Sequence, residues 1–193
     1  MKSKEFLVLI ILIIFIIMFV KLKKSELVYV ASDIDSNKYL VRDLEDKNKA
    51  ANLLARLKKN IDFLVEHLVT NRNKNIDMSE AIDQLEYRIN GVIISESSPD
   101  SEYTSYSVNK GEEIVYCLRS RENNSLHALN LMMYVTLHEL AHVGCKEIDH
   151  TPLFKKIFAF FTQTAIDIGL YQKIDFANEP KVYCGLTITD SIV

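Results

Sequence analysis

The amino-acid sequence predicts an α+β domain that follows an N-terminal transmembrane helix. The first observation is an uninterrupted apolar run, FLVLIILIIFIIMFV, at residues 6–20. The second is that short β-prone runs and amphipathic segments of helical period make up the rest of the chain. The third is that 193 residues, 48% of them hydrophobic and 25% charged, suit one globular domain. We therefore expect an anchor at residues 1–22 and a domain at residues 23–193.

The apolar run is followed directly by the lysines of KLKK. As a helix it would span roughly 22 Å at about 1.5 Å per residue, and snorkelling lysines would extend it toward the roughly 30 Å of a bilayer core. A cleavable signal peptide and a buried core helix are the alternatives, but lysines at this position disfavour cleavage. We expect a single-pass membrane protein that contacts the lipid bilayer through residues 6–22, with its orientation left open.

The charge of the remaining chain is acidic. Residues 22–193 carry 20 basic and 25 acidic side chains, a net charge of −5. This sign is unfavourable for binding phosphate backbones or anionic lipid headgroups. We expect no nucleic-acid partner.

The first half of the domain has two predicted strands and two predicted helices. Runs rich in Val, Tyr and Leu at Leu27–Ala31 and Lys38–Arg42 flank a turn-prone segment, which predicts a β-hairpin or two short strands. Apolar residues at three- and four-residue steps predict a long amphipathic helix over 46–69. A second helix is predicted to begin with a capping box at residues 77–80 and to end at Gly91.

A second hairpin and a central helix follow. Two β-prone runs, Tyr103–Val108 and Glu112–Leu118, flank Asn109-Lys110-Gly111, and a glycine-containing turn of this kind joins hairpin strands. The segment Asn123-Asn124-Ser125 is both an N-glycosylation sequon and, more simply, the cap of a helix that runs to about Val143. This helix is apolar on almost every side, so we expect it at the centre of the domain.

The last predicted helix begins at Thr151-Pro152, with Thr as the N-cap and Pro at the first helical position. It ends at Gly169. Its lysines and Asp167 exclude a second membrane span.

The central helix carries the motif His138-Glu139-Leu140-Ala141-His142. Residues i and i+4 lie on one helical face, so both imidazoles can bind one metal ion. The intervening glutamate can act as a general base without being a ligand, and Zn²⁺ is the ion that this spacing favours. A buried hydrogen-bonded His/Glu network is the alternative, although burying these side chains unpaired would cost several kcal/mol.

A third protein ligand and an open fourth position are expected at a catalytic zinc site. His150 is the leading candidate, because the chain can turn back after Gly144 and present it before the last helix begins. A histidine at a helix N-terminus with no special role is the alternative. Glu147 and Asp149 are rival oxygen ligands or could orient a histidine, and Cys145 is a weaker rival. His67 and His127 read as ordinary surface or helix-end residues.

These motifs resemble a known family. The segments HELAH, HTPLFKKIF and a late YCG are similar to the WLM (Wss1-like metalloprotease) family and its SprT-like relatives, above all to predicted WLM-type metallopeptidases of large DNA viruses. The resemblance runs from about Val28 to the C-terminus and includes Ser32–Asp35, Tyr39–Arg42, Asn109–Gly111 and Tyr183–Gly185.

The resemblance implies a minimal zincin-like domain with an active-site helix, a small mixed sheet and flanking helices. It implies zinc ligands at His138, His142 and His150, and a catalytic base at Glu139. Cellular members act on proteins crosslinked to DNA. The predicted anchor and the acidic domain depart from that pattern, so the chemistry carries over and the substrate does not.

Tyr183 lies in a C-terminal tail next to Cys184. A tyrosine near such a site can donate to a developing oxyanion, although a tail tyrosine more often has a packing role. Three cysteines are too few for a disulfide scaffold, and their odd number leaves at least one unpaired within the chain.

The sequence therefore predicts a membrane-anchored zinc metallopeptidase, in a host or virion membrane if it is viral, that acts on a protein or peptide. The alternative is a non-enzymatic viral membrane protein with a structural or vestigial metal site. Zincins resemble one another in presenting an edge strand beside the active-site helix, where an extended substrate can pair. The predicted substrate strand consists of Ile114, Val115, Tyr116, Cys117 and Leu118.

Overall fold

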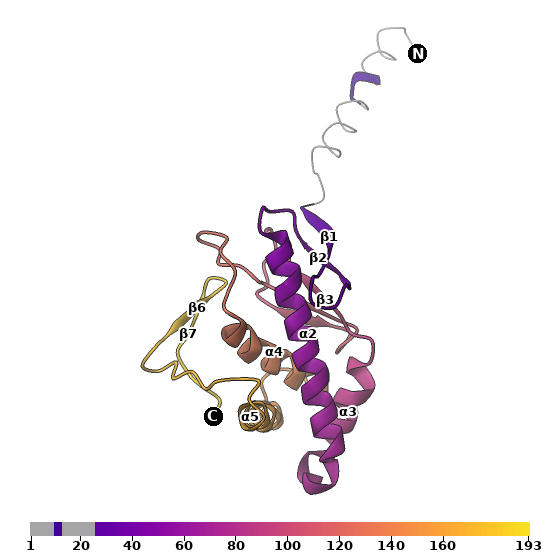
Figure 1. Ribbon diagram of the computed structural model, residues 1–193. Coiled ribbons are helices and arrows are strands. Elements are labelled where there is room, and N and C mark those ends of the chain that lie inside the picture. The colour runs from indigo at the N-terminus through magenta and orange to yellow at the C-terminus, as the bar shows by residue number, and fades with distance from the viewer. Residues whose placement is uncertain (1–9, 13–25) are drawn as a thin grey trace.

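The computed structural model describes residues 10–12 and 26–193. Residues 26–193 form a mixed α/β domain in which the long helix α2 runs along the domain, beside the sheet and the other helices (Figure 1). The helices are α2 (Lys47–Thr70), α3 (Ser79–Ile89), α4 (Leu129–Gly144) and α5 (Pro152–Asp167), with short 3-10 turns at Arg72–Lys74 and Ile76–Met78. The strands are β1 (Leu27–Ala31), β2 (Lys38–Arg42), β3 (Ile93–Glu96), β4 (Tyr106–Val108), β5 (Glu113–Tyr116), β6 (Lys181–Tyr183) and β7 (Leu186–Ile188).

The central sheet has the strand order β3–β5–β4. β5 is antiparallel to β4, as the predicted hairpin requires, and parallel to β3. Strand β3 was not predicted, because two of its four residues, Ser95 and Glu96, are polar. Both are buried with a partner: Ser95 donates a hydrogen bond to Glu113, and Glu96 accepts one from Arg119. The other predicted hairpin, β1–β2, also forms, and β2 packs against α2.

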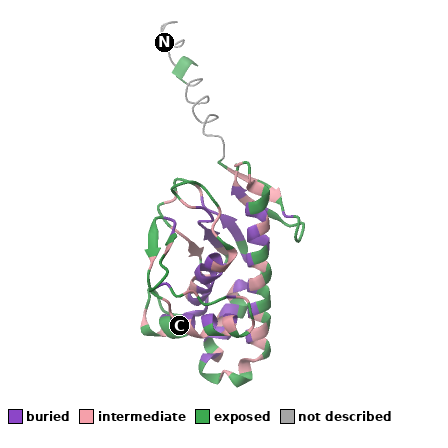
Figure 2. Ribbon diagram, turned by 60° about the vertical axis from the view of Figure 1, so that its left-hand side comes forward, coloured by how far each residue is buried: buried purple, intermediate pink, exposed green. Residues whose placement is uncertain are grey.

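Helix α4 lies at the centre of the domain, as its apolar sequence predicted (Figure 2). It packs against α2, α3 and α5. At its C-terminal end the chain passes so close to its neighbours that a Cβ on Gly144 would lie 3.1 Å from the Ala81 carbonyl oxygen and 3.2 Å from the Phe161 ring. The start of this helix was predicted too early, since Leu126 forms an antiparallel bridge with Arg119 and stays extended.

The helix caps differ in how well local sequence predicted them. Thr151 caps α5 as expected, and its hydroxyl oxygen accepts a hydrogen bond from the Phe154 N–H at 3.2 Å. The capping box before α3 does not form, because Ser79 donates its hydroxyl to the Ile76 carbonyl oxygen and Met78 occupies the N-cap position.

The fold class requires a correction at the N-terminus. Within residues 10–12 and 26–193, no helix combines the length and the apolar character needed to cross a bilayer. A span needs about 20 apolar residues, and the described helical residues in the predicted anchor are Ile10, Ile11 and Leu12 alone. The rest of the segment 6–22 lies outside the described residues. The described structure therefore does not contain the predicted transmembrane helix, on which the predicted membrane localisation rested, and its class is mixed α/β.

Candidate metal centre

Helix α4 and the loop that follows it bring three histidines together. His138 and His142 are one turn apart on α4, and both are half-buried. After Gly144 the chain reverses, with Asp149 in the left-handed region at φ 68°. This reversal places His150, directly before the Thr151 cap of α5, against the other two imidazoles.

The three Nε2 atoms form a nearly equilateral triangle. They are separated by 3.2 Å between His138 and His142, and by 3.1 Å from each of these to His150. Each Nε2 is either a donor or an acceptor, so at least one of the three pairs must join two donors or two acceptors. A tetrahedral zinc ion with Zn–N bonds of about 2.0–2.1 Å separates its nitrogen ligands by about 3.3–3.4 Å. The donor set and its spacing therefore fit a shared metal ion better than a hydrogen-bonded network.

Two aromatic rings of α5 pack against the cluster, and both belong to the HTPLFKKIF segment. The ring centroid of Phe154 lies 4.2 Å from that of His142, 4.8 Å from His150 and 5.1 Å from His138. Phe158, one turn later, lies 5.2 Å from His138. Rigid apolar neighbours of this kind restrict the imidazole orientations and keep the ligand atoms convergent.

The surroundings keep the α4 imidazoles neutral. Burial, reinforced by His142 and His150, lowers the pKa of His138 to about 3. Burial and the neighbouring His150 lower the pKa of His142 to about 4. A metal ion binds the unprotonated nitrogen, so these two ligands need not lose a proton at neutral pH before binding.

Glu139 lies beside this cluster with an environment of its own. Its side chain is 5% exposed, and burial raises its pKa to about 7. A carboxyl group with a pKa near neutrality can both accept and return a proton at physiological pH. Its position is therefore chemically suited to general acid–base work.

The cluster opens into a cavity of about 600 Å³. One wall comes from β4 and the residues before it, a second from α4 and α5, and a third from the C-terminal hairpin β6–β7. The lining residues are Thr104, Ser105, Tyr106, Ser107, Tyr134, Val135, His138, Glu139, His142, His150, Phe158, Tyr183, Leu186 and Ile188.

The rival ligands do not join the triangle. In the described part of the chain, the group able to hold an ion consists of His138, His142 and His150. Glu147 and Asp149 are exposed on the loop, and Cys145 is a fully buried free thiol.

The predicted substrate strand also needs a correction. β5 contributes Ile114, Val115 and Tyr116, and it lies between β3 and β4 in the sheet. Its backbone is hydrogen-bonded on both sides, so no peptide can pair with it. The edge strands of this sheet are β3 and β4, and Tyr106 and Ser107 of β4 line the cavity.

Sequence reasoning missed the C-terminal wall of the cavity. β6 and β7 pair antiparallel across Cys184-Gly185, both of which have positive φ. Cys184 forms a disulfide with Cys117, which follows β5. Two β-prone runs joined by a two-residue turn containing glycine could have indicated the hairpin. Nothing local could have indicated the pairing of cysteines 67 residues apart.

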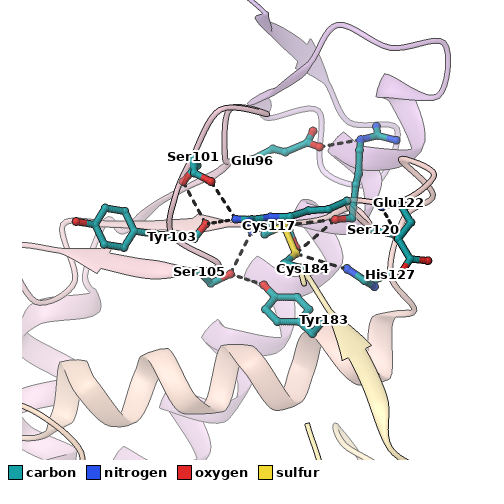
Figure 3. Close-up of a disulfide and its surroundings, with 12 residues drawn as sticks. Glu96, Ser101, Tyr103, Ser105, Cys117, Ser120, Glu122, His127, Tyr183 and Cys184 are labelled. Atoms are coloured by element: carbon teal, nitrogen blue, oxygen red, sulfur yellow. Dashed lines mark hydrogen bonds and ion pairs between the residues drawn. A yellow bond between two sulfur atoms is a disulfide. The ribbon is translucent and has the colours of Figure 1, made fainter. Parts of the chain in front are cut away.

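Tyr183 and His127 meet at this disulfide. The Tyr183 hydroxyl is hydrogen-bonded to Ser105 at 2.5 Å, and its ring lies 5.1 Å from that of His127 (Figure 3). His127, which read as an ordinary helix-end residue, is half-buried, and its Nε2 lies 3.6 Å from Cys184 Sγ.

Comparison with known proteins finds viral relatives and one solved structure. No family model matches the chain. The chain is 46% identical over 186 residues to the uncharacterized protein R325 of Acanthamoeba polyphaga mimivirus, covering 96% of this chain and 94% of that protein. It is 35% identical over 71 residues to the uncharacterized protein 136R of Invertebrate iridescent virus 6, which covers 36% of this chain and 39% of that protein. A crystal structure of Wss1 from Saccharomyces cerevisiae matches with a TM-score of 0.42 and 18% identity, over 65% of this chain and 83% of that one.

Proposed function

This chain belongs to the same protein family as R325 of Acanthamoeba polyphaga mimivirus, and from that premise and its histidine cluster we propose that it is a zinc-dependent metallopeptidase. The observation that carries the proposal is the triangle of three Nε2 atoms at 3.1–3.2 Å beside a buried glutamate and a cavity. The resemblance of HELAH and HTPLFKKIF to WLM-type metallopeptidases supports the same reaction.

In this proposal His138, His142 and His150 would hold the zinc ion. When bound, zinc supplies a Lewis acid that polarises a carbonyl group and acidifies water. Glu139 accepts a proton from the attacking water and later delivers it to the nitrogen of the departing amine, so that it ends the cycle in its starting state. Its pKa of about 7 suits both transfers.

The substrate is proposed to be an extended peptide that lies in the cavity along β4. In the described chain, β4 pairs with β5 on one side, and Tyr106 and Ser107 line the cavity. An edge strand offers backbone hydrogen bonds that make little demand on peptide sequence. Tyr134, Phe158 and Ile188 in the opposite walls would favour a large apolar side chain. No nucleic acid is part of this proposal.

The adjoining cavity favours an enzyme over a structural metal site. Structural zinc sites are closed by four protein ligands, whereas catalytic sites have three and leave one position open. The cluster in the described chain has three candidate ligands and adjoins the cavity.

The test compares the purified full-length chain with Glu139→Gln. We expect about one zinc ion per chain in both proteins, measured by elemental mass spectrometry, and hydrolysis of an unstructured protein such as casein by the parent alone. Removing a general base costs about 10²–10⁴-fold in rate. Glu147→Gln, an exposed carboxyl on the neighbouring loop, is the matched control and should keep full activity. Equal hydrolysis by Glu139→Gln would refute the mechanism, and zinc binding without hydrolysis would assign a structural site.

A further inference from the structure

The C-terminal hairpin forms a wall of the cavity while burying little of itself. Of the six residues in β6 and β7, Tyr183 is the one that is buried. Val182 is 52% exposed and Leu186 is 58% exposed. Figure 1 shows the hairpin in yellow at the side of the domain, away from α2. Apart from Tyr183 and the turn residue Cys184, which are 4% and 2% exposed, the hairpin buries little apolar surface, and such segments open locally at a low free-energy cost.

The tip of the hairpin is fastened through one covalent bond. The Cys117–Cys184 disulfide joins it to the residue that follows central strand β5. The base of the hairpin is held separately, since the Ile192 N–H donates to the Tyr134 hydroxyl at 3.1 Å and Ser191 donates to the Ile174 carbonyl oxygen at 2.7 Å. The disulfide at the tip and the hydrogen bonds at the base therefore involve different residues.

The disulfide lies next to the contacts of the Tyr183 hydroxyl. Ser105 Oγ accepts the Cys117 N–H at 3.1 Å and contacts the Tyr183 hydroxyl at 2.5 Å (Figure 3). If Ser105 gives its proton to the Tyr183 oxygen, the Tyr183 proton is left for a group in the cavity. Burial raises the pKa of Tyr183, so this phenol is neutral and can donate. Tyr183 and Glu139 line the same cavity.

We propose that the Cys117–Cys184 disulfide is a positioning bond: it holds Tyr183 in the cavity as a hydrogen-bond donor to the substrate carbonyl, and a small-molecule dithiol that reduces it releases the hairpin tip and leaves the histidine cluster intact. The reduction transfers two electrons and two protons from the dithiol. The Sγ–Sγ bond breaks, Cys117 and Cys184 become thiols, and the reductant becomes a cyclic disulfide. The donor role rests on the proposed peptidase function, whereas the release of the hairpin does not.

The first experiment measures the hairpin directly in the zinc-loaded full-length chain. Alkylation under denaturing conditions should count one thiol, Cys145, before dithiothreitol treatment and three afterwards. Amide hydrogen exchange of peptides covering 181–188 should then accelerate by roughly tenfold or more, because local opening replaces a covalent constraint. Peptides from α4 and the zinc content should not change.

Two variants serve as controls. The double variant Cys117→Ser/Cys184→Ser should exchange like the reduced parent and ignore dithiothreitol. Cys145→Ala, which removes the free thiol, should respond to dithiothreitol as the parent does. Three thiols in the untreated parent, unchanged exchange over 181–188 after full reduction, or simultaneous exchange of α4 would each overturn the proposal.

The second experiment tests the link to Tyr183 through kinetics. Tyr183→Phe should lower kcat by about 10²-fold, typical of losing one oxyanion donor, with little change in KM or zinc content. Reduction of this variant should lower kcat no further, since the hydroxyl that the disulfide positions is already gone. If reduction lowered kcat of Tyr183→Phe by as large a factor as it lowers kcat of the parent, the disulfide would act independently of Tyr183. If the parent protein had no peptidase activity, the proposed function would be refuted. The hydrogen-exchange experiment would still show whether reduction releases the hairpin tip.

Discussion

At the scale of single residues, the histidine cluster combines local and distant effects. The spacing of His138 and His142 is local, because one turn of helix places residues i and i+4 on one face. His150 approaches them through the reversal at Asp149 and the contact of Phe154 with all three rings. The cluster is therefore assembled mostly by short-range geometry, and its three members could be predicted from the sequence.

We expect His142→Ala to abolish stoichiometric zinc binding. This imidazole is 3.1–3.2 Å from both other ligand atoms, so its loss removes one of three ligand bonds. Mutating a residue that only supports a metal ligand typically lowers metal affinity by roughly 10–100-fold. Removing the ligand itself should lower the zinc affinity by more than that. Competition with a chromogenic chelator measures it. His67→Ala, a histidine in the last turn of α2, is the control, and unaltered zinc affinity in His142→Ala would remove this residue from the site.

The buried carboxyl of Glu139 predicts a pH-dependent stability. Its pKa rises from 4.5 to about 7, so the folded protein holds the proton more tightly than the unfolded chain. Stability from this group is present at acid pH and is lost as the pH rises through that interval, where the unfolded carboxyl has already ionised. In zinc-free protein, Glu139→Gln should gain on the order of 3 kcal/mol over the parent between these pH values, measured by urea unfolding. If the free energy of unfolding changed equally with pH in the two proteins, the raised pKa of Glu139 would be contradicted.

At the scale of elements, the central sheet decides where a substrate can bind. The hairpin of β4 and β5 was predictable from its turn, whose residues Asn109, Lys110 and Gly111 all have positive φ. The parallel partner β3 could not be predicted in the same way. Its polar residues Ser95 and Glu96 interrupt the apolar pattern of a strand, and the residues that pair with them are distant in sequence. Because β5 pairs with this unpredicted strand, it is a central strand, whereas the sequence predicted an edge strand.

Val115→Pro should therefore abolish cooperative folding. Val115 is opposite Ser95 on one side and Tyr106 on the other, and proline removes a ladder hydrogen bond and is excluded from central strands. Loss of the near-UV circular dichroism signal and of a cooperative thermal transition would be the readout. Val115→Ala, which keeps the N–H, should remain folded. A folded Val115→Pro protein with weakened peptide binding would restore β5 as the substrate strand.

At the scale of the whole molecule, one buried charge cluster joins distant segments. Arg119, 2% exposed, donates to Glu96 at 2.8 Å and to Asp46 at 2.8 Å. Glu96, 1% exposed, also accepts the Arg42 N–H at 2.7 Å. The cluster therefore connects β2, β3, the start of α2 and the segment after β5.

Removing one partner should destabilise the whole domain. Glu96→Ala leaves Arg119 buried with an incomplete set of acceptors, and breaking a buried pair in this way typically costs about 3–5 kcal/mol. Glu80→Ala breaks the exposed pair with Lys146 and should cost about 0–1 kcal/mol. Chemical denaturation measures both, and equal effects would mean that the buried cluster contributes no more than a surface pair.

What the sequence by itself determined about this protein is local. The boundaries of β1, β2 and α5, the turn between β4 and β5, and the shared face of His138 and His142 depend on interactions within a few residues, which the order of side chains dictates. Tertiary structure alone decided the central position of β5, the burial that raises the pKa of Glu139, and the pairing of Cys117 with Cys184 next to Tyr183. These features arise from contacts between segments far apart in the chain. Secondary-structure propensity and the local spacing of residues do not indicate which distant segments come into contact.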